Sequence, residues 1–349
     1  MANLGLFIAP PTGMWEAIIS AFSNVFVNYA LAIIMLTLVI KIILLPLDYL
    51  NKRTTRKTTQ MQAVIQPELD VINKKYEKDP AMKNQKTQEL YKKHGFNMGG
   101  SCLVMFFNLA LTLVVFFTLF AGLNNMAAYK ITYQYEQLQS VYQASVSTSP
   151  AYANEQVALK YDEIKDSFLW IDNVWIADSP LKSSIPTFDE YKTIARVTLV
   201  DGEYKAWGDL TEEQLEVAKT EYETIMNPLR EMKNGVNGYF ILAVLIVGST
   251  VLTQLISTKK LFRKKNKDAN ATEQVTAKTN TFMLILMPAM MGFFAISTNA
   301  VFALYLLASQ VVAMVSTPLI DLVLDKMDKK KAQQAYDKDL AKKGRIVKK

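Results

Sequence analysis

The sequence has very few of the residues that metal sites and many active sites require. Its 349 residues include one cysteine, Cys102, and one histidine, His94. A lone cysteine excludes an intramolecular disulfide, and the two residues are too few for a Cys- and His-rich metal centre or for His-based catalysis. The phosphate-binding pattern G-x-x-x-x-G-K-[ST] is also absent. We therefore expect no metal, no other cofactor and no enzymatic activity.

Charge is scarce as well, at 20% of residues, whereas 50% are hydrophobic. Soluble domains rarely combine this composition with apolar runs of about 20 residues, the length of a helix that crosses a bilayer. Such runs predict membrane spans at residues 25–47, 101–122, 237–257, 281–297 and 299–321. The sequence thus predicts an all-α polytopic membrane protein with five transmembrane helices.

The segments outside these runs differ in the sign of their charge. Lys and Arg outnumber Asp and Glu by 11 to 6 in residues 48–100, by 7 to 2 in 257–280 and by 10 to 4 in 322–349, whereas residues 123–234 contain 10 basic and 18 acidic side chains. Basic segments stay in the cytoplasm. We therefore expect the N-terminus outside, the C-terminus inside, a cytoplasmic loop at 258–280, a cytoplasmic tail at 322–349 and an extracellular cap at 123–236.

The first 24 residues do not resemble a cleavable signal peptide, because they lack a basic n-region and because Pro10, Pro11 and Glu16 interrupt the apolar stretch. Apolar residues from Trp15 to Phe26 recur at helical spacing. This pattern predicts an extracellular helix in the membrane interface, residues 1–24. The alternative is an N-terminal extension of the first span.

Residues 48–100 predict a cytoplasmic helical hairpin. Asp79 followed by Pro80 is a helix-start signal, and His94 followed by Gly95 is a stop signal. Pro67 lies within the first arm, where we expect a kink or a new turn. Charged loops between spans are common, so helicity alone does not indicate function here.

The extracellular cap is expected to contain both helices and strands. Residues 196–200 and 203–207 flank an Asp201-Gly202 turn, which predicts a β-hairpin. Thr211 and Gln214 form a capping box that opens a helix. The acidic residues of the cap are spread along helices and form no catalytic cluster.

Lys41 interrupts the first apolar run. A central charge there costs about 2.5–3.5 kcal/mol and usually faces an aqueous cavity or has a function. The alternative is snorkelling, because Leu47 is six residues away, roughly 9 Å along a helix.

Polar residues in the other spans are candidates to line the same cavity. They are Asn108, Thr112, Thr250, Gln254, Ser309 and Gln310. Each of them alone also fits a structural role, because polar side chains hold neighbouring membrane helices together.

Several stretches are similar to one known family. They are residues 41–47 with Pro46, Gln66-Pro67-Glu68, 90–97, 100–103, 168–172, Met287-Pro288 and Ala303-Leu304-Tyr305. In this order and spacing they resemble the YidC/Oxa/Alb membrane protein insertases. The resemblance covers all five predicted spans and the hairpin.

This resemblance implies a five-helix core with a hydrophilic groove that opens to the cytoplasm and to lipid and is closed from outside. It implies that Lys41, where the family usually has arginine, attracts acidic residues of a substrate's translocated tail. The face between the third and fifth spans would guide the incoming helix, and we place Leu252, Ile256, Phe302 and Leu306 there. The hairpin would receive the substrate through the region of Gln66, Pro67, Glu68, Tyr91, His94 and Gly95.

The resemblance also implies a bacterial cell membrane protein whose partners are nascent membrane proteins and the lipid bilayer. The Sec translocon and the ribosome are further candidates, and DNA is not expected. The basic tail fits ribosomal RNA, anionic lipid or a purely topogenic role. Two other functions stay open: an anion or solute transporter that uses Lys41, and a non-catalytic assembly scaffold.

Overall fold

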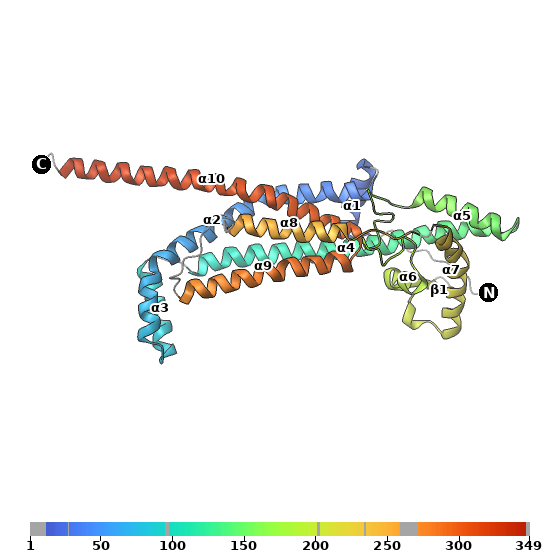
Figure 1. The fold of residues 1–349 in the computed structure, drawn as a ribbon, viewed down its shortest axis with the longest axis horizontal. Coiled ribbons are helices and arrows are strands. Elements are labelled where there is room, and N and C mark those ends of the chain that lie inside the picture. The colour runs from blue at the N-terminus through green and yellow to red at the C-terminus, as the bar shows by residue number, and fades with distance from the viewer. Residues whose placement is uncertain are drawn as a thin grey trace. The chain divides into compact units, whose positions relative to one another are not determined.

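The computed structural model describes residues 12–26, 28–94, 98–200, 203–233, 235–258 and 271–346. The elements are α1 (Met14–Phe26), α2 (Tyr29–Lys75), α3 (Pro80–Lys93), α4 (Met98–Ser145), α5 (Pro150–Ile164), α6 (Phe188–Ala195), β1 (Val197–Val200), β2 (Glu203–Ala206), the 3-10 helix η1 (Trp207–Asp209), α7 (Glu212–Lys233), α8 (Ile241–Thr258), α9 (Ala271–Ser297) and α10 (Ala300–Ile346) (Figure 1). Within the described ranges β1 and β2 form the one sheet. The predominantly helical chain confirms the all-α prediction.

Among the residues that the structure describes, three helices are long and apolar enough to cross a membrane, over Tyr29–Met61, Leu103–Ser145 and Ala300–Gln334. Two shorter apolar helices cover Ile241–Ile256 and Leu284–Ser297. Large apolar side chains are exposed along α4, among them Leu103 and Phe106. A surface of this kind is stable against lipid rather than water. The five predicted spans thus correspond to three long helices and two short ones, and the count of five stays a prediction.

The chain divides into two compact units. Unit 1 comprises Met1–Val39 and Phe117–Met314, and unit 2 comprises Ile40–Phe116 and Val315–Lys349. The long helices α2, α4 and α10 contribute residues to both.

In unit 1, α1 is a helix separate from α2. The side-chain oxygen of Asn28 accepts hydrogen bonds from the backbone N–H of Ala30 at 2.9 Å and of Leu31 at 3.3 Å, which caps the start of α2. The buried Glu16 of α1 accepts a hydrogen bond from Asn125 of α4 at 2.9 Å. A helix is thus present over Met14–Phe26. Residues 1–11 lie outside the described residues, and the expected bounds of 1–24 and the position in a membrane interface stay predictions.

An aromatic cluster forms the core of the α4–α8 insertion, the segment between α4 and α8. The ring of Tyr222 in α7 lies 4.7 Å from that of Tyr191 in α6 and 4.9 Å from that of Tyr135 in α4. Burial raises the pKa of Tyr222 well above its usual value, and its hydroxyl donates to the carbonyl of Pro186 at 2.8 Å. These rings fix α6 and α7 against the end of α4.

The β-hairpin and the capping box predicted in the insertion are both present. β1 and β2 pair antiparallel, with Val200 opposite Glu203, and the turn residues Asp201 and Gly202 lie outside the described residues. The backbone N–H of Gln214 donates to the hydroxyl of Thr211 at 3.2 Å, and the N–H of Thr211 donates to the Gln214 side chain at 3.0 Å. The hairpin and the capping box are both confirmed.

The insertion is attached to the beginnings of α8 and α10. Asp178 is 1% exposed, and its carboxylate accepts from the N–H of Tyr239 at 2.8 Å and of Leu242 at 2.7 Å. The N–H of Ala300 donates to the carbonyl of Ile176 at 3.0 Å. Helix starts have unpaired N–H groups, so these bonds anchor the insertion to both helices.

Helices α8 and α9 pack against each other in unit 1. A Cβ on Gly292 of α9 would lie 2.8 Å from a methyl carbon of Val247 in α8. Glycine at this position is therefore what permits the close approach of the two backbones.

Unit 2 contains the predicted helical hairpin of α2 and α3. Asp79 caps α3 by accepting from the N–H of Met82 at 3.0 Å, with Pro80 in the first turn, and His94 is the C-terminal cap residue. Gly95 lies outside the described residues. Helix α2 continues through Pro67 without starting a new helix there.

Candidate functional site: charged and polar side chains of the apolar helices

Lys41 lies in α2 within a run of large apolar residues, and its neighbours Ile42 and Ile43 are 68% and 70% exposed. The Lys41 side chain is half-buried. Within the described residues its ammonium group has no hydrogen bond or ion pair. The charged group that interacts electrostatically with this ammonium group is the carboxylate of Asp48. Asp48 lies seven residues further along α2, about two helical turns, and therefore on the same face of the helix.

The arrangement leaves Lys41 able to bind an anion. An ammonium group has three donors, and its attraction for a carboxylate grows as the surroundings become less polar. Asp48 is too far along the helix for direct contact, since two turns rise roughly 10 Å. Lys41 can therefore pair with an external carboxylate without first breaking an internal salt bridge.

Asn108 and Thr112 of α4 are the other predicted groove residues in unit 2. They are one turn apart, and the Thr112 hydroxyl donates to the Asn108 carbonyl at 2.8 Å. The Asn108 side-chain amide is half-buried and makes no hydrogen bond to another described residue. It is thus a half-buried polar group in an apolar helix.

The remaining groove residues belong to unit 1. Thr250 of α8 is buried, and its hydroxyl donates to the carbonyl of Ile246 at 2.7 Å, which satisfies it within its own helix. Gln254 of α8 and Gln310 of α10 are half-buried, and the hydroxyl of Ser309 is buried. The predicted set is therefore divided between the two units, and its convergence on one groove stays a prediction.

The residues predicted to guide an incoming helix differ in exposure. Leu252 of α8 is 42% exposed, and Ile256 is half-buried. Phe302 and Leu306 of α10 are 0% and 1% exposed. The Phe302 ring lies 4.8 Å from that of Phe120. These two α10 residues therefore lie inside the protein, where a substrate cannot touch them as they stand, whereas Leu252 is accessible.

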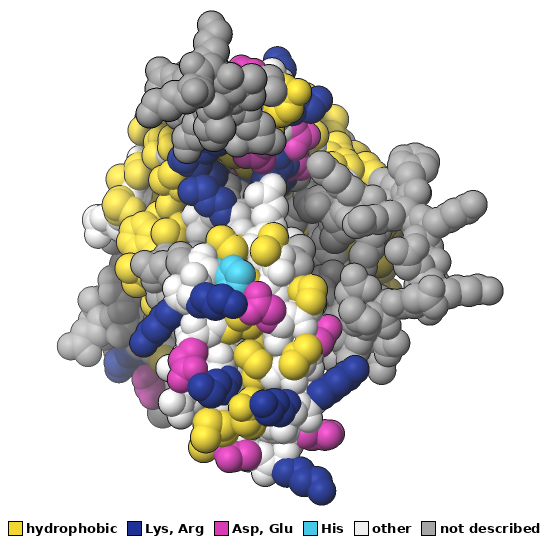
Figure 2. All heavy atoms as spheres, turned by 90° about the vertical axis from the view of Figure 1, so that its left-hand side faces the viewer, with side chains coloured by type: hydrophobic (Ala, Val, Ile, Leu, Met, Phe, Trp, Pro, Cys, Tyr) yellow, Lys and Arg dark blue, Asp and Glu magenta, His cyan; other side chains and the backbone are white. Residues whose placement is uncertain are grey.

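Two of the predicted hairpin residues, Glu68 and His94, meet where α3 ends beside α2. Glu68 accepts from the ammonium of Lys93 at 3.0 Å and lies 3.0 Å from Nε2 of His94. Both bonds lower the pKa of Glu68 below its usual value, and the bond from Lys93 has the larger effect. Figure 2 shows the single histidine, in cyan, against an acidic side chain, with basic and acidic groups interspersed around it.

The other hairpin residues have supporting positions. Gln66 donates to Asp70 at 2.8 Å within α2. Pro67 continues that helix, and Tyr91 of α3 is half-buried. The hairpin surface is thus polar and of mixed charge, which suits brief contacts with varied segments.

A charged cluster in unit 2 was not predicted from the sequence. Arg56 of α2 pairs with Asp321 at 2.9 Å, Asp325 at 2.6 Å and Asp328 at 3.4 Å, all on α10, and Lys52 pairs with Asp321 at 2.9 Å. One feature of the sequence could have indicated it. Lys52 and Arg56 are four residues apart, as are Asp321 and Asp325, so each pair lies on one face of its helix. The sequence did not indicate that these faces meet.

Comparisons with known proteins identify one family. Residues 21–329 match the family described as 60Kd inner membrane protein. The protein named "Membrane protein insertase YidC" from Clostridium tetani is 43% identical over 84 residues, 24% of this chain and 36% of that protein. Its namesake from Fusobacterium nucleatum is 38% identical over 96 residues, 28% of this chain and 45% of that protein. The matched part covers less than half of each relative.

Proposed function

The chain belongs to the 60Kd inner membrane protein family, and on this premise we propose that it is a membrane protein insertase. It helps short hydrophobic segments of nascent membrane proteins to enter the bilayer and to fold there. The observation that carries the proposal is Lys41, a half-buried cation in an apolar helix that forms no salt bridge with any described residue. A side chain in this position is costly to keep unless it has a function.

The mechanism follows from the physical chemistry of α2 and α4. Lys41 attracts a carboxylate of the substrate's polar tail, and the amide NH₂ group of Asn108 offers hydrogen bonds that replace part of its hydration. A hydrated groove shortens the path of the tail through hydrocarbon. Burial of the substrate's own apolar segment in lipid then supplies the driving force, about 25 cal/mol per Å².

We place the protein in a bacterial cell membrane with five spans, the N-terminus outside and the C-terminus in the cytoplasm. The sorting of charge between segments supports this topology. The polar hairpin then lies in the cytoplasm, where it receives substrates. The Sec translocon and the ribosome are partners that fit this location, the ribosome through the basic end of α10.

Insertion into liposomes tests the proposal. The substrate is a single-spanning protein with an acidic translocated tail, and protease protection measures its insertion. We expect the unchanged protein and Lys41→Arg to insert it and Lys41→Ala to fail, because only the last removes the charge. Lys57→Ala is the matched control, since Lys57 is an exposed lysine of the same helix.

Each other result has a defined meaning. Equal insertion by all variants would reduce Lys41 to a snorkelling anchor. If no variant exceeded empty liposomes, the insertase function would be refuted. A substrate whose tail carries Asn and Gln in place of its acids should be insensitive to Lys41→Ala.

A further inference from the structure

Unit 1 contains a cavity of about 480 Å³ between the α4–α8 insertion, the middle of α4 and the connection from α9 to α10. This volume lies in the range of sites for small molecules and short peptide segments, about 300–1,000 Å³. Phe120 and Trp175 supply an aromatic wall, and Asn124, Asn299 and Arg196 are polar members of its lining. None of these residues takes part in the function proposed above.

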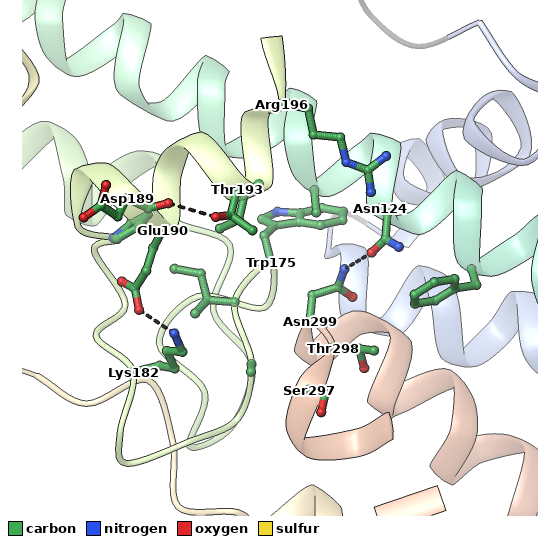
Figure 3. Close-up of a pocket in the computed structure, with 16 residues that line it drawn as sticks. Asn124, Trp175, Lys182, Asp189, Glu190, Thr193, Arg196, Ser297, Thr298 and Asn299 are labelled. Carbon is green, nitrogen blue, oxygen red and sulfur yellow. Dashed lines mark hydrogen bonds and ion pairs between the residues drawn. The ribbon is translucent and has the colours of Figure 1, made fainter. Parts of the chain in front are cut away.

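The charges that line the cavity are balanced except for one. Lys182 pairs with Glu190 at 2.5 Å, and Asp189 pairs with Lys192 at 3.0 Å. The side chain of Arg196 has neither a hydrogen bond nor an ion pair with any residue that the structure describes. Figure 3 shows it extending from the end of α6 on the side of the cavity where Asn124 and Asn299 face each other.

The backbone of Arg196 is unusual. Its φ is 62° and its ψ is −35°, a region that side chains with a Cβ rarely adopt and where glycine is favoured. The chain passes here from α6 directly into β1. Such strain persists at sites where it has a use, and here it holds a guanidinium group at the cavity.

Two amides complete the polar side of the cavity. Asn299 accepts from the N–H of Phe302 at 2.9 Å, and its own NH₂ group donates to the side-chain oxygen of Asn124 at 3.2 Å. This chain of bonds orients Asn124 and leaves its NH₂ group as a donor. The guanidinium of Arg196 and this NH₂ group are both suited to the oxygens of a carboxylate.

We propose that this cavity binds a short acidic peptide segment, with its carboxylate at Arg196 and Asn124 and an apolar side chain against Phe120. The inference rests on the insertase function, because a translocated acidic tail is then the natural occupant. A phosphate site gathers several free cations, whereas this cavity has one unpaired arginine among balanced pairs.

The test measures peptide binding by the full chain in nanodiscs of zwitterionic lipid. The probe is a labelled, end-blocked peptide with one aspartate between leucines, and the matched peptide has asparagine instead. We expect at least about tenfold tighter binding of the aspartate peptide. Arg196→Gln should abolish this difference, whereas Lys219→Gln, at a lysine of α7 outside the cavity lining, should keep it.

A second variant separates binding from folding. Arg196→Gly removes the guanidinium and relieves the positive φ, so it should lose the aspartate preference while its melting temperature rises. Equal binding of both peptides by the unchanged protein would overturn the proposal. So would Arg196-dependent binding of a labelled anionic phospholipid together with no binding of the aspartate peptide.

The same assay distinguishes this inference from the insertase proposal. Lys41→Ala should keep the aspartate preference, because Lys41 does not line the cavity. Loss of insertion with intact peptide binding supports both statements. Absence of insertion activity in every variant refutes the insertase function, and equal binding of the two peptides refutes the cavity assignment alone.

Discussion

Arg56 of α2 and Asp321 of α10 are joined by a hydrogen bond of 2.9 Å between guanidinium and carboxylate, although 265 positions separate them in the sequence. Their side chains are 20% and 14% exposed, so water screens the pair only in part. Asp325 and Asp328 share the same guanidinium. The contact ties α2 to α10 within unit 2.

Breaking this contact should destabilise unit 2. Because Arg56 holds three carboxylates together, we expect Arg56→Ala to lower the free energy of unfolding by about 1–2 kcal/mol. Denaturation in mixed micelles measures the change, and a double-mutant cycle with Asp321→Ala isolates the pair. Lys86→Ala, which removes an exposed pair with Glu89, is the control and should cost less than about 0.5 kcal/mol. Additive single effects would contradict direct coupling.

Asp178 should be required for docking of the α4–α8 insertion on α8. In Asp178→Asn one of the two accepting oxygens becomes an NH₂ group, which leaves the N–H of Tyr239 or Leu242 without a partner. We expect a loss of about 1–3 kcal/mol in unfolding free energy. Asp189→Asn, at an 89% exposed carboxylate, should change stability by less than about 0.5 kcal/mol. Equal effects of the two substitutions would argue against the capping role.

Gly238 should not tolerate a side chain. An added Cβ would lie 1.9 Å from a carboxylate oxygen of Asp178, so Gly238→Ala has to displace the capping aspartate and should cost about 1–3 kcal/mol. Gly248→Ala in α8 is the control, because nothing lies within 4 Å of a Cβ there. Alanine also favours the helix by roughly 0.5–1 kcal/mol. Thermal unfolding should therefore shift in opposite directions for the two variants.

The α2–α3 hairpin should open as the solution becomes acidic. Lys93 and His94 lower the pKa of Glu68 in the folded hairpin, so the stabilising contribution is fully present above the usual glutamate value of 4.5 and is lost as pH falls through the lowered pKa. Spin labels on α2 and α3 should report a broader distance distribution below about pH 4.5. Glu68→Gln should already show it at neutral pH. A distance distribution unchanged by pH would show that the ionised Glu68 does not hold the hairpin closed.

High salt gives an independent check on the same contact. Glu68 is exposed, so dissolved ions screen its attraction to Lys93. The screening length is about 8–10 Å at ordinary ionic strength and becomes shorter as salt is added. Raising the salt at neutral pH should broaden the same distance distribution in the unchanged protein and leave Glu68→Gln unaffected.

Local signals allowed much of the fold to be predicted. The cap at Asp79 with Pro80, the box of Thr211 and Gln214 and the pairing of β1 with β2 each depend on residues close together in the chain. The apolar runs likewise predicted the long helices, because their length and composition are properties of the sequence itself. Lys41 was identified for the same reason, as a charge inside such a run.

Contacts between distant segments were decided by the tertiary structure alone. Helical periodicity shows which residues share a face, but not which neighbour covers that face. The sequence therefore assigned Phe302 to a surface for substrates, whereas packing against Phe120 buries it. The partners of Arg56, and the lack of a partner for Arg196 among the described residues, likewise depend on segments brought together by folding. Composition and period thus determined the elements and the class of protein, and packing determined which side chains are enclosed, paired or available to a ligand.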